Sequence, residues 1–132
     1  RVLTEAQKLH DRATEALGFL GLGRAHWAMQ QPDEARTFWE EGLLAARDGG
    51  ALPTEALILG SLGMAYSQQA QFDAARGYYT KAIAIARQIG NRREEARLLA
   101  ELAKLHRQSG RHGDAAACQE QVAAIERELG VG

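Results

Sequence analysis

The sequence has little cysteine, little proline and no long hydrophobic run, and each scarcity excludes a class of protein. The single cysteine, Cys118, excludes an internal disulfide and favours a reducing compartment, so we expect a cytoplasmic location. No run approaches the roughly 18 apolar residues of a membrane-spanning helix, so no membrane contact is predicted. Only two prolines occur among the 132 residues, and Ala, Leu, Arg, Glu and Gln dominate, which favours helix.

The chain also lacks an excess of charge of either sign. It has 16 Lys and Arg against 17 Asp and Glu, for a formal net charge of −1. This balance gives no overall attraction to nucleic acid or to an anionic membrane. A hydrophobic content of 45% with 25% charged residues is instead typical of an ordinary globular protein.

What the sequence does contain is a repeat with a period of 40 residues. Residues 15–54 and 55–94 are identical at 13 of 40 positions without a gap. A more divergent third copy, residues 95–132, keeps five of the same residue types in register: Glu95, Ala96, Leu102, Ala115 and Gly130. A fixed period of this size indicates a stacked array of helices.

Each copy is predicted to hold two antiparallel helices. In the second copy, apolar residues recur at helical spacing from Pro53 to Gln69, and a second helix runs from an N-cap at Asp73 to about Gln88. Gly90 is a natural C-terminal cap, as are its counterparts Gly50 and Gly130. Short turns make the two helices antiparallel neighbours.

We therefore interpret residues 1–132 as a single array. Residues 1–12 are predicted to be the end of a preceding repeat, followed by repeats at 13–52, 53–91 and 92–132. In this interpretation Arg1–His10 is the tail of a second helix, and the chain is a piece of a longer protein.

Small residues at matching places predict how the helices pack. Gly23, Gly63 and Ala103 lie midway along the first helices, where close approach of helix axes requires small side chains. The bulky Trp39 and Tyr79 are expected to fill the space beside them.

These motifs resemble the tetratricopeptide repeat. The second copy carries the resemblance best, in Leu62-Gly63-x-x-Tyr66, Phe72-Asp73-x-Ala75 and Tyr78-Tyr79-x-x-Ala82. The first copy matches with Leu22-Gly23-x-x-His26 and Phe38-Trp39-x-x-Gly42, and the third departs by placing Gln119 at the aromatic position. The 40-residue period is similar to the longer-helix variety found in kinesin light chains and in bacterial large ATP-binding or NB-ARC-type regulators.

The resemblance implies an all-α fold, in which antiparallel helix pairs stack into a right-handed superhelix, an α-solenoid. It also implies a concave groove lined by the first helices, which binds a peptide or protein segment. The composition, rich in Ala and Arg, favours a bacterial origin.

Helical spacing places a candidate groove on the first helices. Residues three and four apart share one face of a helix. The predicted groove residues are Leu17, Leu20, Arg24 and Trp27 in the first copy, Leu57, Met64 and Ser67 in the second, and Arg97, Lys104 and Arg107 in the third. The stripe runs from apolar to basic, and residues 91–111 hold six Lys and Arg against three Glu, a local charge of +3. We therefore expect a partner segment with acidic character.

Other chemistries find weaker support. The four histidines and Cys118 are not paired at zinc-site spacing, so no metal is predicted. The carboxylate pair Glu40-Glu41 points apart on a helix, and Gly18-x-x-Gly21-x-Gly23 lies inside a helix without the context of a phosphate-binding loop. We expect no enzyme activity and no cofactor. Nucleic-acid binding is disfavoured because no aromatic side chain interleaves with the arginines.

The last predicted helix offers a candidate surface for self-association. Val122, Ile125 and Leu129 have no following helix to cover them, and a terminal repeat normally needs a polar cap. Two copies of the chain would then meet through this helix as a homo-oligomer.

The function predicted from the sequence is a non-catalytic scaffold that binds a partner segment in its concave groove. The alternative is the sensor or oligomerisation region of a bacterial transcriptional regulator, with other domains elsewhere in that protein.

Overall fold

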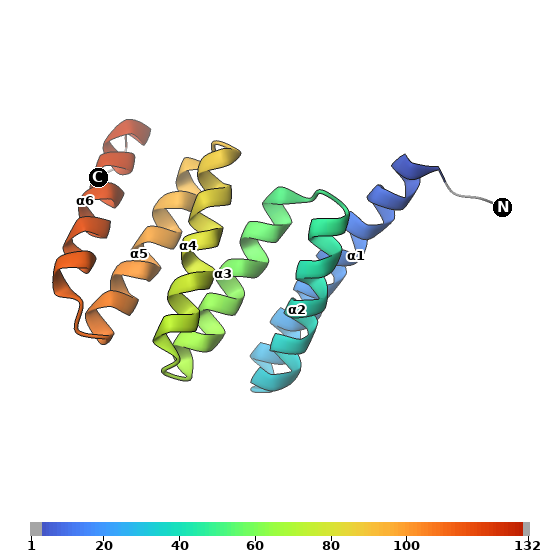
Figure 1. Cartoon of the computed structure of the whole chain (residues 1–132), viewed down its shortest axis with the longest axis horizontal. Coiled ribbons are helices and arrows are strands. Elements are labelled where there is room, and N and C mark those ends of the chain that lie inside the picture. The colour runs from blue at the N-terminus through green and yellow to red at the C-terminus, as the bar shows by residue number, and fades with distance from the viewer. Residues whose placement is uncertain (1–3, 131–132) are drawn as a thin grey trace.

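A computed structural model describes residues 4–130, which form six α-helices and contain no strand. The helices are α1 (Glu5–Ala28), α2 (Pro32–Asp48), α3 (Leu52–Gln68), α4 (Phe72–Gln88), α5 (Arg92–Gln108) and α6 (His112–Leu129). They stand side by side in a row, with α1 at one end and α6 at the other (Figure 1). The densest packing joins α1 with α2, α3 with α4, and α5 with α6, and α2–α3 and α4–α5 contacts link these pairs. The all-α helical-repeat solenoid expected from the sequence is confirmed.

The same tight turn joins each helix to the next. A residue with positive φ recurs in the turns at Gln30, Gly50, Ala70, Gly90 and Gly110, and again after α6 at Gly130. The amide that follows the positive-φ residue bonds back to a carbonyl five residues earlier, as from Ala51 N to Ala46 O at 2.8 Å, which closes a Schellman motif. The predicted glycine caps are therefore confirmed. The predicted N-cap is wrong: α4 begins at Phe72 and has Gln71 as its N-cap, because the turn ends two residues earlier than we expected.

The predicted helix boundary near the N-terminus is also wrong. Helix α1 runs unbroken through Glu5–Ala28, so residues 5–12 belong to the first helix of the first pair and not to a preceding helix. The physical reason is that His10 and Ala13 stand where the second copy has Gly50 and Pro53, so nothing there favours a turn. Residues 1–3 of that prediction lie outside the described part of the chain.

Glycines on the first helices make room for aromatic rings on the second helices. A Cβ atom on Gly63 would lie 2.9 Å from Tyr79 Cε1, and one on Gly23 would overlap the indole of Trp39. Trp39 and Tyr79 are 1% and 2% exposed, so each ring is held against its glycine. The Trp39 indole N–H also donates a hydrogen bond of 3.2 Å to the carbonyl of Leu20.

Ion pairs link each helix pair to the next at matching positions. Arg47 Nε lies 3.2 Å from Glu55 Oε2, and Arg87 Nε lies 2.6 Å from Glu95 Oε2. The side chain of Glu95 is only 3% exposed and also pairs with Arg92 Nη1 at 2.7 Å. The stacking of pairs is therefore fixed in register by charge as well as by apolar packing.

The apolar residues predicted to be uncovered on the last helix are covered by the chain itself. Val122 and Ile125 are 8% and 2% exposed and belong to the hydrophobic core, and Leu129 is half-buried against it. They lie on the inner side of α6, which packs on α5. The prediction that all three form an open apolar surface is wrong.

Candidate ligand pocket on the first helices

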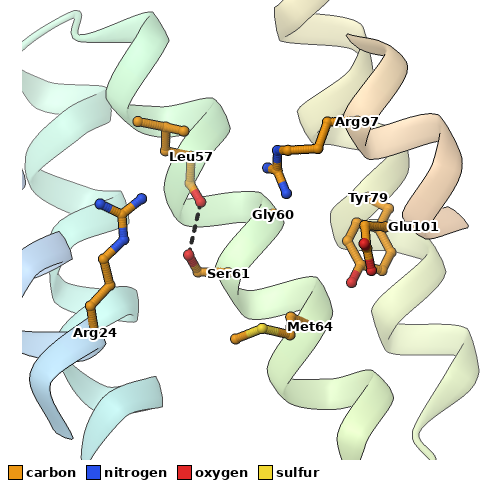
Figure 2. A pocket seen from close by; sticks show the side chains of 8 residues that line it. All are labelled: Arg24, Leu57, Gly60, Ser61, Met64, Tyr79, Arg97 and Glu101. Carbon is orange, nitrogen blue, oxygen red and sulfur yellow. Dashed lines mark hydrogen bonds between the residues drawn. The ribbon is translucent and has the colours of Figure 1, made fainter. Parts of the chain in front are cut away.

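A pocket of about 240 Å³ opens on the face shared by α1, α3 and α5 (Figure 2). Its lining residues are Arg24, Leu57, Gly60, Ser61, Met64, Tyr79, Arg97 and Glu101. Helix α3 supplies the central wall, and Ser61 Oγ turns back to donate to the carbonyl of Leu57 at 3.0 Å. The buried Gly60 lets α5 pack closely at the edge of the pocket, since an added Cβ would lie 3.1 Å from Leu98 Cδ2.

Four of the ten predicted groove residues come together here. Arg24 extends from α1 on one side, Arg97 extends from α5 on the other, and Leu57 and Met64 project from α3 between them (Figure 2). Leu57 and Met64 are seven residues apart, which is two helical turns, so they share a face. One apolar surface is thus flanked by two guanidinium groups.

The structure places the other predicted residues elsewhere. Leu20 is only 4% exposed and belongs to the core, so its assignment to an open groove is wrong. The reason is that Leu20 lies on the side of α1 that meets α2, where Trp39 bonds its carbonyl. Leu17 is exposed and Ser67 is half-buried, and neither lines the pocket.

The two ends of the predicted stripe also lie outside this pocket. Trp27 lines a separate hollow with Gln30 and Pro32, and its ring lies 5.9 Å from that of Trp39. Lys104 and Arg107 are exposed on α5 but do not line the pocket.

Three polar residues of the pocket, Ser61, Tyr79 and Glu101, were missed by the sequence reasoning. Tyr79 comes from α4 and reaches the pocket beside Gly63, and Glu101 lies one helical turn after Arg97 on α5. Burial raises the pKa of Tyr79 to about 12, helped by the charge of Glu101 and opposed by that of Arg97, so the phenol stays protonated. The helical spacing of Glu101 from Arg97 could have identified the glutamate.

The positive charge of the pocket is partly neutralised by neighbouring carboxylates. Arg97 pairs with Glu94, and this hydrogen-bonded pair raises the pKa of the guanidinium. Lys104 Nζ lies 3.4 Å from Glu101 Oε1. Arg24 makes no ion pair with any residue in the range 4–130. Arg24 is therefore the cation of the pocket most available to a ligand.

Within residues 4–130, no three His, Cys, Asp or Glu side chains gather closely enough to hold a metal ion. Cys118 is buried, and this burial raises the pKa of its thiol, which disfavours the reactive thiolate. None of the described helices is long and apolar enough to cross a membrane.

Solved structures with similar folds include a TPR domain. BtubC (BKLC) from P. vanneervenii aligns with a TM-score of 0.81 and 18% identity over 87% of this chain and 48% of its own. The TPR domain of Arabidopsis FLU aligns with a TM-score of 0.78 and 18% identity over 89% and 98%. Aspartyl phosphate phosphatase F from Bacillus subtilis aligns with a TM-score of 0.83 and 13% identity over 90% and 31%. The chain thus spans about half the length of BtubC and a third of the phosphatase.

The comparison with curated protein sequences gives no match. The family model for the tetratricopeptide repeat matches twice, at residues 14–88 and 54–128. The two matches overlap and are offset by 40 residues, as the internal repeat requires, and together they cover most of the six helices. The chain therefore belongs to the tetratricopeptide repeat family.

Proposed function

We propose that this chain is a non-catalytic interaction module whose first helices form a concave groove that binds a partner's segment. Tetratricopeptide repeats generally mediate protein–protein interaction. The observation that carries the proposal here is the pocket in which Arg24, Leu57, Met64 and Arg97 meet from three successive first helices. A segment lying across α1, α3 and α5 would contact all four.

The pocket favours a partner with an apolar anchor next to an acidic group. Leu57 and Met64 are half-buried and offer an apolar surface, and the flexible thioether of Met64 adapts to differently shaped side chains. Arg24 has its guanidinium available and can form a bidentate pair with a carboxylate. The acidic preference therefore rests mainly on Arg24, because Arg97 and Lys104 already have carboxylate partners.

A peptide-display selection tests the proposal. We expect the chain to enrich sequences in which Asp or Glu lies close to a large apolar residue. The variants Arg24→Glu and Met64→Glu should each weaken binding of a selected peptide by roughly tenfold or more, because one reverses the attracting charge and the other places a charge on the apolar anchor.

An exposed lysine on α4 serves as the control. Lys81→Glu changes an exposed residue of α4 outside the pocket and should leave binding unchanged. Arg107→Glu tests whether the site extends along α5 beyond the pocket. Peptides that bind equally well to Arg24→Glu, Met64→Glu and the unchanged chain would contradict the proposed site.

A further inference from the structure

Tyr79 brings a free hydroxyl group to the pocket on the first helices. The residue is 2% exposed, and its ring packs against Gly63. Its hydroxyl makes no hydrogen bond with any of residues 4–130, yet Tyr79 lines the pocket (Figure 2). Buried polar groups normally have a hydrogen-bond partner, and the open space of the pocket is where a partner for this hydroxyl can enter.

The equivalent position in the other two copies holds no free ring donor. In the first copy, the indole N–H of Trp39 donates to the carbonyl of Leu20 at 3.2 Å. The third copy has the exposed Gln119 at this position. A buried ring donor without a partner therefore occurs at this place, within residues 4–130, only in the copy that forms the central wall of the pocket. This difference points to a contact with a ligand and not to a general requirement of the fold.

A neighbouring carboxylate determines which hydrogen-bond acceptor suits the hydroxyl. Glu101 and Arg97 line the same pocket from α5 (Figure 2), and Arg97 is paired with Glu94. Burial raises the pKa of Tyr79 to about 12, and the negative charge of Glu101 contributes more to this value than the opposing charge of Arg97. Surroundings that disfavour a phenolate also disfavour a carboxylate bound at the same place. The acceptor that suits Tyr79 is therefore a neutral carbonyl oxygen.

The cation most available to a ligand lies on the opposite side of the pocket. Arg24 extends from α1, and Leu57 and Met64 on α3 lie between it and Tyr79 (Figure 2). Its guanidinium makes no ion pair with any residue in the range 4–130. An acidic group of a bound segment is thus attracted to the α1 side of the pocket, and a carbonyl group suits the side formed by α4 and α5.

We propose that Tyr79 is a specificity-determining residue of this groove, whose hydroxyl donates a hydrogen bond to a neutral carbonyl oxygen of the partner segment. The inference rests on the proposed function, because it concerns the same pocket. From α1 to α5, the preferred segment presents a carboxylate for Arg24, a large apolar side chain for the surface of α3, and an amide group for Tyr79. Glu101 offers an acceptor for the N–H of that amide. The amide belongs either to an Asn or Gln side chain or to the backbone of the segment.

Two tyrosine variants and a peptide selected with the unchanged chain test the role of Tyr79. Tyr79→Phe keeps the ring against Gly63 and removes only the hydroxyl. Binding measured by isothermal titration calorimetry should weaken by roughly tenfold, because a carbonyl of the peptide loses its hydrogen bond, while stability in urea should stay the same. Tyr78→Phe is the matched control: it removes a hydroxyl from the neighbouring residue, which does not line the pocket, and should leave binding unchanged.

Changes in the peptide identify the carbonyl group. Replacing each Asn or Gln by Leu tests the side chains, and replacing each peptide bond by an ester, whose carbonyl is a weaker acceptor, tests the backbone. The change that affects the bound carbonyl should weaken binding to the unchanged chain but hardly alter binding to Tyr79→Phe, in which the hydrogen bond is already lost. If the carbonyl belongs to Asn or Gln, changing that residue to Asp or Glu should also weaken binding, and Glu101→Gln should reduce this loss.

The variants separate the role of Tyr79 from the existence of the groove. Weaker binding to Arg24→Glu together with unchanged binding to Tyr79→Phe would leave the groove in place and overturn the role of Tyr79. Equal weakening by Tyr79→Phe and Tyr78→Phe would overturn it as well, since both hydroxyls would then act through the fold. Tighter binding of the peptide that carries Asp or Glu in place of the amide would overturn the preference for a neutral acceptor. A chain that binds no peptide would contradict both proposals.

Discussion

A tyrosine ring dictates the residue type at position 63. Even an alanine Cβ at this position would lie 2.9 Å from Tyr79 Cε1, closer than packed carbon atoms tolerate. Gly63→Ala should therefore destabilise the chain by about 1–3 kcal/mol through overpacking, although alanine is the better helix former. Urea denaturation measures the change in the free energy of unfolding.

The third copy supplies the control for this prediction. It pairs Ala103 with Gln119, which is exposed and places no ring against the first helix. The double variant Gly63→Ala with Tyr79→Gln should therefore lose less stability than the sum of its two single changes. Strict additivity would show that the ring is not what requires glycine at position 63.

The candidate pocket shows what residue spacing can and cannot predict. Spacing along α3 placed Leu57 and Met64 on one face, and the 40-residue period aligned them with Arg24 and Arg97. Spacing gives the direction of a side chain but not the depth of its surroundings, so Leu20 was assigned to the surface although it is 4% exposed. Tyr79 was missed for a related reason, because it enters the pocket from α4 and not from a first helix.

At the scale of single elements, the helix ends depend on backbone conformation. Gln30 and Ala70 have φ values of +61° and +59°, a region that L-residues other than glycine enter at a cost, whereas Gly50 and Gly90 occupy it at matching turns. Gln30→Gly and Ala70→Gly should each stabilise the chain by about 1 kcal/mol, and Gly50→Ala and Gly90→Ala should each destabilise it by a similar amount. Thermal and urea unfolding of the four single variants measure these effects. A stability loss in the first two variants would contradict the turn geometry.

The length of each element was predictable only where the sequence contains a turn residue. Glycines at 50, 90 and 130 made three helix ends visible, and the structure gives each of them a positive φ. The first helix lacks such a signal, because position 10 holds a histidine and not a glycine. The 40-residue register alone suggested a helix end there, but α1 is continuous. A helix boundary in one copy therefore predicts a boundary in the next copy only when the turn residues that form it are repeated as well.

At the scale of the whole molecule, stability depends on the contacts between helix pairs, because the main contacts within residues 4–130 join each pair to the next one along the row. Two equivalent ion pairs differ in burial: the side chain of Glu55 is 13% exposed and that of Glu95 is 3% exposed. Arg87→Met should cost about 2 kcal/mol, since among residues 4–130 it leaves the buried Glu95 with Arg92 as its one remaining ion-pair partner. Arg47→Met should cost less than about 1 kcal/mol, because water can reach Glu55.

The helices that lose protection from hydrogen exchange show whether Arg87 links two helix pairs or stabilises the whole chain. If Arg87 holds the third pair to the second, hydrogen exchange in the Arg87→Met variant should accelerate most in α5 and α6, while α1 and α2 keep their protection. The Arg47→Met variant should shift the weak point to the junction of α2 and α3 and affect exchange less overall. Uniform acceleration across all six helices in both variants would mean that the chain unfolds as one unit and that the ion pairs do not set the boundaries between its parts.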